Sequence, residues 1–183
     1  MILEARVFTE HTIESAPPAA RRAMTATASH LGYLPAAIAR WASSPQLLDG
    51  FQKLTALFDT TTLDPVAREV VVMTIATRNG CHLCVAMHTA SLTALRADAG
   101  LIAALRAGQP PADPRLAAIR EFTLRVLDTA GDVGEPALRA FLGHGYTEQN
   151  ALEVVLGIGT YVMSTLANRL TAAPVDDQLR AFA

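Results

Sequence analysis

Both cysteines of the chain lie in one short stretch, NGCHLCVAMHTASL at 79–92, and His88 follows them. Spacings of three and four place Cys81, Cys84 and His88 on one face of the stretch if it is helical. The β-carbons of such neighbours lie about 5–6 Å apart, whereas a disulfide prefers about 3.5–4.5 Å. We therefore predict that the two cysteines can bond after a small adjustment, and that the bond is easily reduced.

A thiol must lose its proton before it attacks, and two features of this stretch favour that loss. The start of a helix presents partial positive charge near Cys81. His88 lies one turn beyond Cys84 and can accept its proton or stabilise its thiolate. The first feature favours Cys81 as the attacking residue and the second favours Cys84, so the spacing alone leaves this choice open.

Glu69 is the carboxylate that the pattern connects with this chemistry. It shares a helical stripe with Val72, Met73 and Ala76, so we expect it to be at least partly buried. An unpaired buried charge is costly, whereas a glutamate beside a cysteine and a histidine can relay protons.

Plainer interpretations of the same residues stay open at this point. The cysteines can be small core residues, and Glu69 can be a structural partner for an arginine. A zinc site from Cys81, Cys84 and His88, with or without Glu69, is disfavoured because structural zinc usually takes two ligand pairs and no second pair exists here.

Helices must position these side chains, and the sequence predicts helices almost throughout. Alanine and leucine dominate, apolar residues recur at spacings of three and four, and proline or glycine marks the joints. Asp64, as an N-cap, and Pro65, at the first helical position, predict the start of a helix. RNG at 78–80 predicts its end, so we expect the next helix to begin at or near Cys81. We predict an all-α fold in one domain over 1–183, with 1–13 as a peripheral N-terminal segment. The helices are expected near 17–29, 35–42, 46–58, 65–78, 80–94, 97–107, 114–129, 135–143, 147–170 and 175–181.

A weak internal similarity suggests that the fold is a duplicated helical unit. DPVAREVVV at 64–72 resembles EQNALEVVL at 148–156, which aligns Glu69 with Glu153. Thr165, Asn168 and Ala172 then stand where the first copy has Cys81, Cys84 and His88. The predicted chemistry would thus be kept in one half only.

Composition limits the class of protein. Hydrophobic residues make up 51% and charged residues 17%, with a net charge of −2, so we expect apolar surface to be covered by another subunit. No basic patch indicates nucleic-acid binding. The N-terminus does not resemble a secretory signal, and the apolar segment at 151–170 carries Glu153 and two glycines, as a core helix does rather than a membrane span. We expect a cytoplasmic protein, where a cysteine pair is more often catalytic or metal-binding than structural.

At these spacings the sequence resembles a known family. Glu69, Cys81, Cys84 and His88 are similar to the signature of alkylhydroperoxidase D-like proteins in the carboxymuconolactone decarboxylase-like superfamily. The similarity extends from ESAPPAARRAM at 14–24 through LGYLPAAIARWASSPQLL at 31–48 to YTEQNALEVVLGIGTYVMSTLANRL at 146–170. It covers most of the chain.

The resemblance implies a compact all-α fold assembled into homo-oligomers, either trimers or hexamers. It also implies a thiol peroxidase that needs no metal, haem or flavin. By position, Cys84 would attack the hydroperoxide and Cys81 would resolve the sulfenic acid to a disulfide, while His88 and Glu69 would relay protons. A dithiol donor, lipoyl-like or thioredoxin-like, would then reduce the disulfide.

One position departs from the family pattern. Members often carry histidine or tyrosine just before the second cysteine, whereas this chain has Leu83 there and His82 one place earlier. We expect this change to slow any relay that uses that position. Two other functions are carried forward: a lactone decarboxylase, which would not depend on the cysteine pair, and a redox-sensing helical oligomer without turnover.

Overall fold

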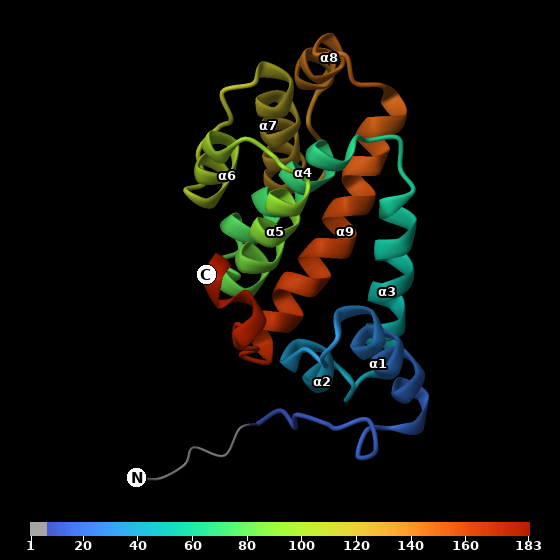
Figure 1. Ribbon diagram of the computed structural model, residues 1–183. Coiled ribbons are helices and arrows are strands. Elements are labelled where there is room, and N and C mark those ends of the chain that lie inside the picture. Colours follow the sequence, from blue (N-terminus) through green and yellow to red (C-terminus); the bar gives the residue numbers. More distant parts are fainter. Residues whose placement is uncertain (1–6) are drawn as a thin grey trace.

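The computed structural model describes residues 7–183, and over these residues all regular secondary structure is helical, with no strand. It forms nine α-helices and one short 3₁₀-helix, η1 (Figure 1). The elements are α1 (Pro18–Leu31), α2 (Ala36–Trp41), α3 (Pro45–Asp59), α4 (Pro65–Arg78), α5 (His82–Ala94), α6 (Ala99–Arg106), α7 (Pro114–Asp128), α8 (Glu135–Gly143), α9 (Glu148–Leu170) and η1 (Asp177–Phe182). The all-α prediction is confirmed; the last predicted helix is a 3₁₀-helix.

The helix starts follow from capping side chains and prolines. Asp64 accepts a hydrogen bond from the amide of Ala67, and Pro65 occupies the first position of α4. Ser44 and Asp113 cap α3 and α7 in the same way, each directly before a proline. At the start of α9, the Thr147 side chain and the Asn150 side chain each bond the other's backbone amide, which makes a capping box.

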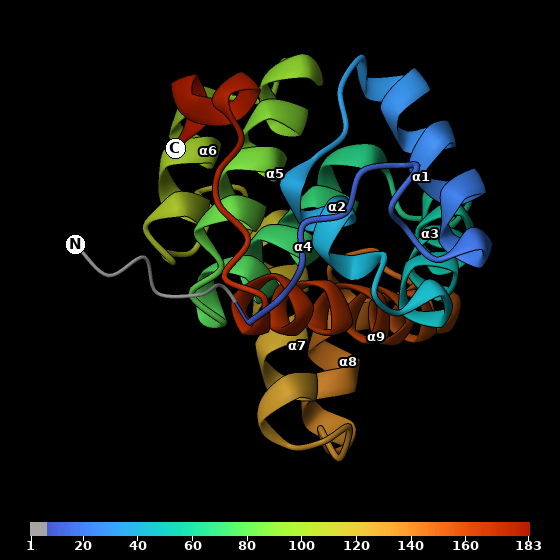
Figure 2. The same ribbon diagram turned by 90° about the horizontal axis from the view of Figure 1, so that it is seen from below.

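Helix α4 lies in the middle of the molecule, with α5 and α6 on one side and α9 and α3 on the other (Figures 1 and 2). Its residues from Val70 to Ala76 are all buried, as expected of a helix that is apolar on every side. It packs against α5, α6, α7 and α9. The helix that carries Glu69 is therefore held on several sides.

A second core cluster lies where α1 and α2 meet the start of α5, and it includes Met24, Trp41, Leu48, Cys81 and Cys84. Part of the predicted peripheral segment at 1–13 reaches this region, because the amide of His11 donates to the carbonyl of Ala39 at 3.2 Å. Residues 1–6 of that segment lie outside the described residues.

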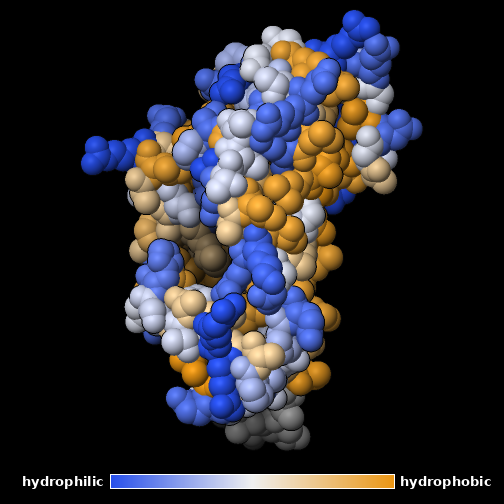
Figure 3. Space-filling model, turned by 90° about the vertical axis from the view of Figure 1, so that its right-hand side faces the viewer, coloured by the Kyte–Doolittle hydropathy of each residue, from blue (hydrophilic) through white to orange (hydrophobic). Residues whose placement is uncertain are grey.

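Helix α9 is long and apolar enough to cross a membrane by length and composition alone. In this structure one of its faces packs against α3, α4 and α7. Its other face is apolar too, since Leu152, Val155, Leu166 and Leu170 are exposed. Figure 3 views the side of the molecule on which α3 lies and shows broad apolar areas between polar ones. Exposed apolar surface agrees with what the composition predicts.

Helix α9 passes close to α3 and α4 at Gly157, which leads to a stability prediction. A β-carbon added there would lie 2.7 Å from Cε2 of Phe58 and 3.2 Å from Cγ1 of Val71. Overpacking of this kind costs about 1–3 kcal/mol, while alanine gains about 1 kcal/mol in helix propensity. We expect Gly157→Ala to lower the free energy of unfolding by up to about 2 kcal/mol in a urea titration followed by circular dichroism.

Gly50 provides the matched control for this prediction, because it lies inside α3 and a β-carbon there would meet nothing within 4 Å. Gly50→Ala should raise the free energy of unfolding by about 1 kcal/mol. Equal effects of the two substitutions would mean that α9 does not approach Phe58 this closely.

The two halves of the proposed duplication differ in whether a break separates their helices. Gly80 has a φ of 62°, a left-handed conformation that glycine adopts easily, and it separates α4 from α5. The aligned residue in the second half is Ser164, and α9 continues through it without a break. The second half therefore lacks the helix start that positions Cys81.

Candidate active site

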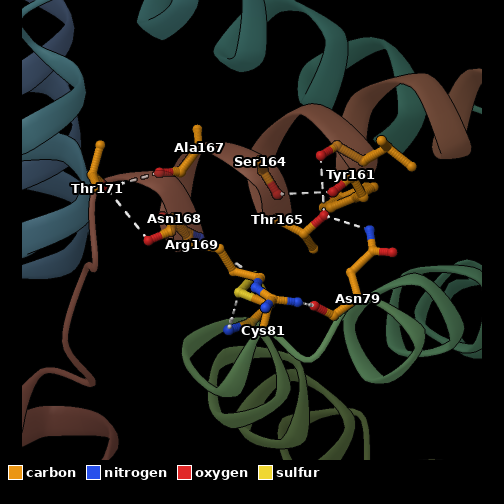
Figure 4. Close-up of a disulfide and its surroundings, with 11 residues drawn as sticks. Asn79, Cys81, Tyr161, Ser164, Thr165, Ala167, Asn168, Arg169 and Thr171 are labelled. Atoms are coloured by element: carbon orange, nitrogen blue, oxygen red, sulfur yellow. Dashed lines mark hydrogen bonds between the residues drawn. A yellow bond between two sulfur atoms is a disulfide. The ribbon is translucent and has the colours of Figure 1, made fainter.

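The two cysteines lie at the start of α5, where they form a disulfide with their Cα atoms 5.3 Å apart (Figure 4). Cys81 is the N-cap of α5, so the prediction that a helix begins at or near it is confirmed. Its Sγ accepts a hydrogen bond from the amide of Cys84 at 3.4 Å. The residues are 2% and 4% exposed, respectively. The disulfide is thus placed at a helix N-terminus and buried.

His88 and Glu69 form the second pair of the site. Nδ1 of His88 lies 2.8 Å from Oε2 of Glu69, and their side chains are 12% and 17% exposed. The contact joins α5 to α4, which pack against each other. Glu69 is therefore partly buried, as predicted, and its partner is the histidine; among residues 7–183 it forms no ion pair with an arginine.

The contact with Glu69 determines which nitrogen of His88 is free for chemistry. An ionised carboxylate only accepts hydrogen bonds, so Nδ1 of His88 carries a hydrogen and donates it to Glu69. Nε2 makes no hydrogen bond within the part of the chain that the structure describes. In a neutral ring with this tautomer, Nε2 is the nitrogen that can accept a hydrogen bond or a proton.

The two pairs meet along α5, which carries Cys84 and His88, but no direct contact joins them within the described residues. His88 follows Cys84 by one turn of α5, a spacing that puts β-carbons about 5–6 Å apart. No hydrogen bond connects His88 with either sulfur within residues 7–183. The two sulfurs are buried, whereas the side chains of His88 and Glu69 are partly exposed to solvent.

Tyr161 on α9 is a site residue that sequence reasoning missed. Its ring meets the His88 ring edge-on, with centroids 5.4 Å apart. Burial, and then the charge of Glu69, raises the pKa of Tyr161 well above its usual value, so its hydroxyl stays protonated. Tyr161 and Glu69 also line a hollow of about 300 Å³, together with Phe58, Val72, Leu95 and others. The carboxylate of the site thus borders a space that a small ligand can enter.

Asn168 on α9 was also not predicted as a site residue. Its Nδ2 donates to Sγ of Cys84 at 3.3 Å, and its Oδ1 is buried without a hydrogen-bond partner within the described part of the chain. Each sulfur therefore has its own donor: the α5 amide for Cys81 and Asn168 for Cys84. One signal existed, because the internal similarity aligns Asn168 with Cys84, 84 residues apart.

Other contacts from α9 hold the turn that precedes the disulfide (Figure 4). Nδ2 of Asn79 donates to Oγ1 of Thr165 at 2.8 Å. The guanidinium of Arg169 donates to the carbonyl of Asn79 and closely approaches Gly80. The loop that sets the start of α5 is thus fixed by the last turns of α9.

Glu153, the counterpart of Glu69 in the internal similarity, has a different environment. Its carboxylate accepts hydrogen bonds from the amide and hydroxyl of Thr62 and from the side chains of Asn150 and Gln149. Burial alone would raise the pKa of Glu153, but these hydrogen bonds together outweigh it and hold the pKa below its usual range. Glu153 anchors the loop before α4, whereas Glu69 faces a histidine.

The remaining motif residues do not join the site. His82 is exposed, and Leu83, which is 3% exposed, packs in the second core cluster. Within residues 7–183, no group of three or more His, Cys, Asp or Glu side chains is arranged to hold a metal ion.

Comparison with known proteins gives a family match for part of the chain and shows the fold. Residues 45–125, which include all four predicted site residues but neither Tyr161 nor Asn168, match the carboxymuconolactone decarboxylase family. A search among curated proteins found no match.

Three solved structures share the fold at low sequence identity. An uncharacterised peroxidase-related protein from Ralstonia eutropha JMP134, described as an alkylhydroperoxidase AhpD core, has a TM-score of 0.84 and 20% identity, over 94% of this chain and 93% of that one. A peroxidase-related protein from Silicibacter sp. TM1040 has a TM-score of 0.79 and 16% identity, over 98% and 97%. The debrominase Bmp8, as a cysteine-to-alanine variant in complex with 2,3,4-tribromopyrrole, has a TM-score of 0.75 and 16% identity, over 98% and 96%.

Proposed function

We propose that this protein, whose residues 45–125 match the carboxymuconolactone decarboxylase family within an alkylhydroperoxidase D-like fold, is a thiol-dependent peroxidase. The observation that carries the proposal is a buried Cys81–Cys84 pair at the start of the same helix whose His88 is bonded to Glu69. A redox-active sulfur pair and a proton relay are the two parts that peroxide reduction by thiols requires.

The proposed cycle uses one hydroperoxide and two thiols. The thiolate of Cys84 attacks the terminal peroxide oxygen, the O–O bond breaks, and Cys84 becomes a sulfenic acid while an alcohol leaves. The thiol of Cys81 then displaces water from the sulfenic acid and forms the disulfide. A dithiol donor, lipoyl-like or thioredoxin-like, reduces the disulfide and is itself oxidised to a disulfide.

His88 handles the protons in this proposal. Its Nε2 takes the proton from the Cys84 thiol, directly or through a water molecule, and returns it to the leaving alcohol oxygen. Glu69 holds the ring by Nδ1 and stabilises its charged form. Tyr161 packs against the ring and limits its rotation. We place this cycle in the cytoplasm and in a homo-oligomer, where dithiol donors keep the pair reduced.

A second candidate, reduction of a halogenated aromatic compound, has one observation in its favour. The hollow beside Glu69 is bordered by the rings of Phe58 and Tyr161, and the fold is shared with a debrominase. In this reaction the two thiols would supply two electrons to a carbon–bromine bond, which yields the hydrogen-substituted ring, bromide and the Cys81–Cys84 disulfide. The same pair would serve both candidates.

A stopped-flow assay of the reduced protein distinguishes these candidates. The peroxidase proposal predicts loss of two thiols per hydroperoxide and continued turnover with dihydrolipoamide. Tribromopyrrole replaces the hydroperoxide in the second arm, with released bromide as the readout. No thiol loss in either arm leaves the redox-sensing interpretation, and lactone decarboxylation that survives in a Cys81→Ala, Cys84→Ala variant supports a decarboxylase.

A further inference from the structure

Asn168 has a hydrogen-bonding pattern that the proposed function does not use. It is 6% exposed and lies on the last turns of α9, beside the disulfide (Figure 4). Its Nδ2 donates to Sγ of Cys84 at 3.3 Å. Oδ1 of the same amide is buried and has no hydrogen-bond partner within residues 7–183. Among the described residues, the amide beside Cys84 is therefore only half satisfied.

The orientation of this amide follows from the oxidised state of the sulfur. A disulfide sulfur carries no hydrogen and can only accept, so the nitrogen of Asn168 faces it and the oxygen is left without a donor. A buried oxygen without a donor is costly. Packing does not require this cost, because the neighbouring Ala167 belongs to the second core cluster together with Cys81 and Cys84, where an apolar side chain would also fit. The unused oxygen thus points to a partner that is present in another state of the site.

The two sulfurs differ in what their partners can offer. Sγ of Cys81 accepts from the backbone amide of Cys84, which is a donor only. Sγ of Cys84 accepts from a side chain that carries a donor and an acceptor in one planar group. A sulfur that attacks peroxide needs a donor while it is a thiolate and an acceptor once it carries a hydroxyl group. The amide of Asn168 provides both of them to Cys84.

We propose that Asn168 is a further catalytic residue, which holds the Cys84 sulfur in two successive states of the cycle; this role rests on the proposed function. Nδ2 first donates to the Cys84 thiolate. The S–O bond then forms and the O–O bond breaks, so that Cys84 is oxidised to a sulfenic acid and the peroxide is reduced to an alcohol, whose oxygen takes the proton held by His88. The new S–OH group donates to Oδ1 of Asn168 until the Cys81 thiol displaces it as water.

The contact with Oδ1 has a consequence for the lifetime of the sulfenic acid. A hydroxyl group that donates to a buried acceptor keeps its hydrogen, because loss of the hydrogen would place two acceptors against each other. Further oxidation to sulfinic acid would be irreversible and would end the cycle. Asn168 therefore favours the form of Cys84 that waits for Cys81 over the form that a second hydroperoxide oxidises.

A pH titration followed by the ultraviolet absorbance of the thiolate tests the donor role. All variants are made in the Cys81→Ser protein, where Cys84 is the only cysteine. Asn168→Asp keeps the size of the side chain but replaces the donor with an oxygen. The midpoint of thiolate formation should rise by at least about one pH unit, because a hydrogen bond to the charged sulfur is lost and a like charge is gained. Asn168→Ala, which adds no charge, should raise the midpoint by less and serves if Asn168→Asp does not fold.

Asn150→Asp is the matched control for the titration. Asn150 also lies on α9 and is also 6% exposed, but its Nδ2 donates to Thr62 and Glu153 at the other end of the helix. The substitution should lower the free energy of unfolding, since it removes these hydrogen bonds. It should leave the midpoint of thiolate formation unchanged, which separates loss of stability from loss of the contact with sulfur.

The lifetime of the sulfenic acid tests the acceptor role. The Cys81→Ser proteins are exposed to excess tert-butyl hydroperoxide, and sulfenic and sulfinic acid are followed over time by trapping and intact mass spectrometry. Asn168→Asp keeps an oxygen acceptor, so its sulfenic acid should form more slowly than in the Cys81→Ser parent but last as long. Asn168→Ala offers neither group, so its sulfenic acid should form more slowly and convert to sulfinic acid several times faster.

The two measurements fail in different ways. A midpoint that Asn168→Asp does not raise, or that Asn150→Asp raises equally, would overturn the role of Asn168 whatever the protein does with peroxide. Equal lifetimes of the sulfenic acid in Asn168→Ala and in the Cys81→Ser parent would overturn the acceptor role. A Cys81→Ser parent that forms no sulfenic acid would overturn the proposed function and the acceptor role with it, while a raised midpoint would still support the contact of Asn168 with the thiolate.

Discussion

Replacement of Cys84 by serine should reduce peroxide-dependent thiol oxidation to the uncatalysed background, because a serine hydroxyl stays protonated at neutral pH and does not attack peroxide oxygen. Cys81→Ser should still react once with hydroperoxide and then stop, since no thiol is left to resolve the sulfenic acid. The measurement is stopped-flow oxidation of the reduced proteins, followed by intact mass spectrometry after sulfenic-acid trapping.

The two variants serve as controls for each other, because Cys81 and Cys84 are the only cysteines of the chain. The structure gives each sulfur a hydrogen-bond donor, the Cys84 amide for Cys81 and Asn168 for Cys84. The choice of Cys84 as the attacking residue follows from the resemblance to alkylhydroperoxidase D-like proteins, and the position of Cys84 one turn before His88 is compatible with it. Full reactivity of Cys84→Ser, with the sulfenic acid trapped on Cys81, would reverse the assignment.

The second large effect is expected at Glu69. Glu69→Gln removes the negative charge that stabilises His88 when the ring is protonated, but it keeps the size of the side chain. A positioned general acid or base contributes about 10²–10⁴-fold to a rate, so we expect the second-order rate constant for hydroperoxide to fall by about that factor. The midpoint of urea unfolding should change little, because the contact is partly exposed.

Glu153→Gln is the matched control, since the weak internal similarity aligns Glu153 with Glu69. It should leave the rate unchanged and lower the free energy of unfolding by about 1–3 kcal/mol, because the amide nitrogen of glutamine faces donors that now lack an acceptor. Equal loss of rate in both variants would show that Glu69 acts through stability rather than through proton transfer.

The wild-type protein and Glu153→Gln should also respond differently to acid. The pKa of Glu153 is lowered in the folded state, so its contribution to stability is complete above its usual value of 4.5 and is lost as the pH falls through the lowered value. The difference in unfolding free energy between the two proteins should therefore shrink below about pH 4.5. A difference that stays constant in acid would contradict the assigned hydrogen bonds.

Local signals determine most of this fold, which is why its helices were predictable. Asp64 with Pro65, and Gly80 after Asn79, are start and stop signals that act within one turn of the chain. The last helix is the exception in type: η1 spans six residues, and periodicity does not separate a 3₁₀-helix from an α-helix at that length.

The predicted site residues lie within two consecutive helices, Glu69 on α4 and the other three at the start of α5 and in its first two turns. Cys81, Cys84 and His88 lie within eight positions of one another, and their helix was legible in the sequence. Tyr161 and Asn168 come from α9, whose approach to α5 depends on the packing of the whole molecule. Sequence spacing cannot predict contacts between residues this far apart in the chain, so these two contacts became known only from the structure.

The depth of the disulfide has a consequence for electron delivery. Cys81 and Cys84 are 2% and 4% exposed, and thiol–disulfide exchange requires the incoming sulfur to reach bonding distance of one of them. In the cycle that we propose, a dithiol at the tip of a slender arm needs a narrower opening to reach these sulfurs than a thiol on the surface of a globular reductase does. We therefore expect the shape of the donor, as well as its reduction potential, to affect which reductant can reduce the pair.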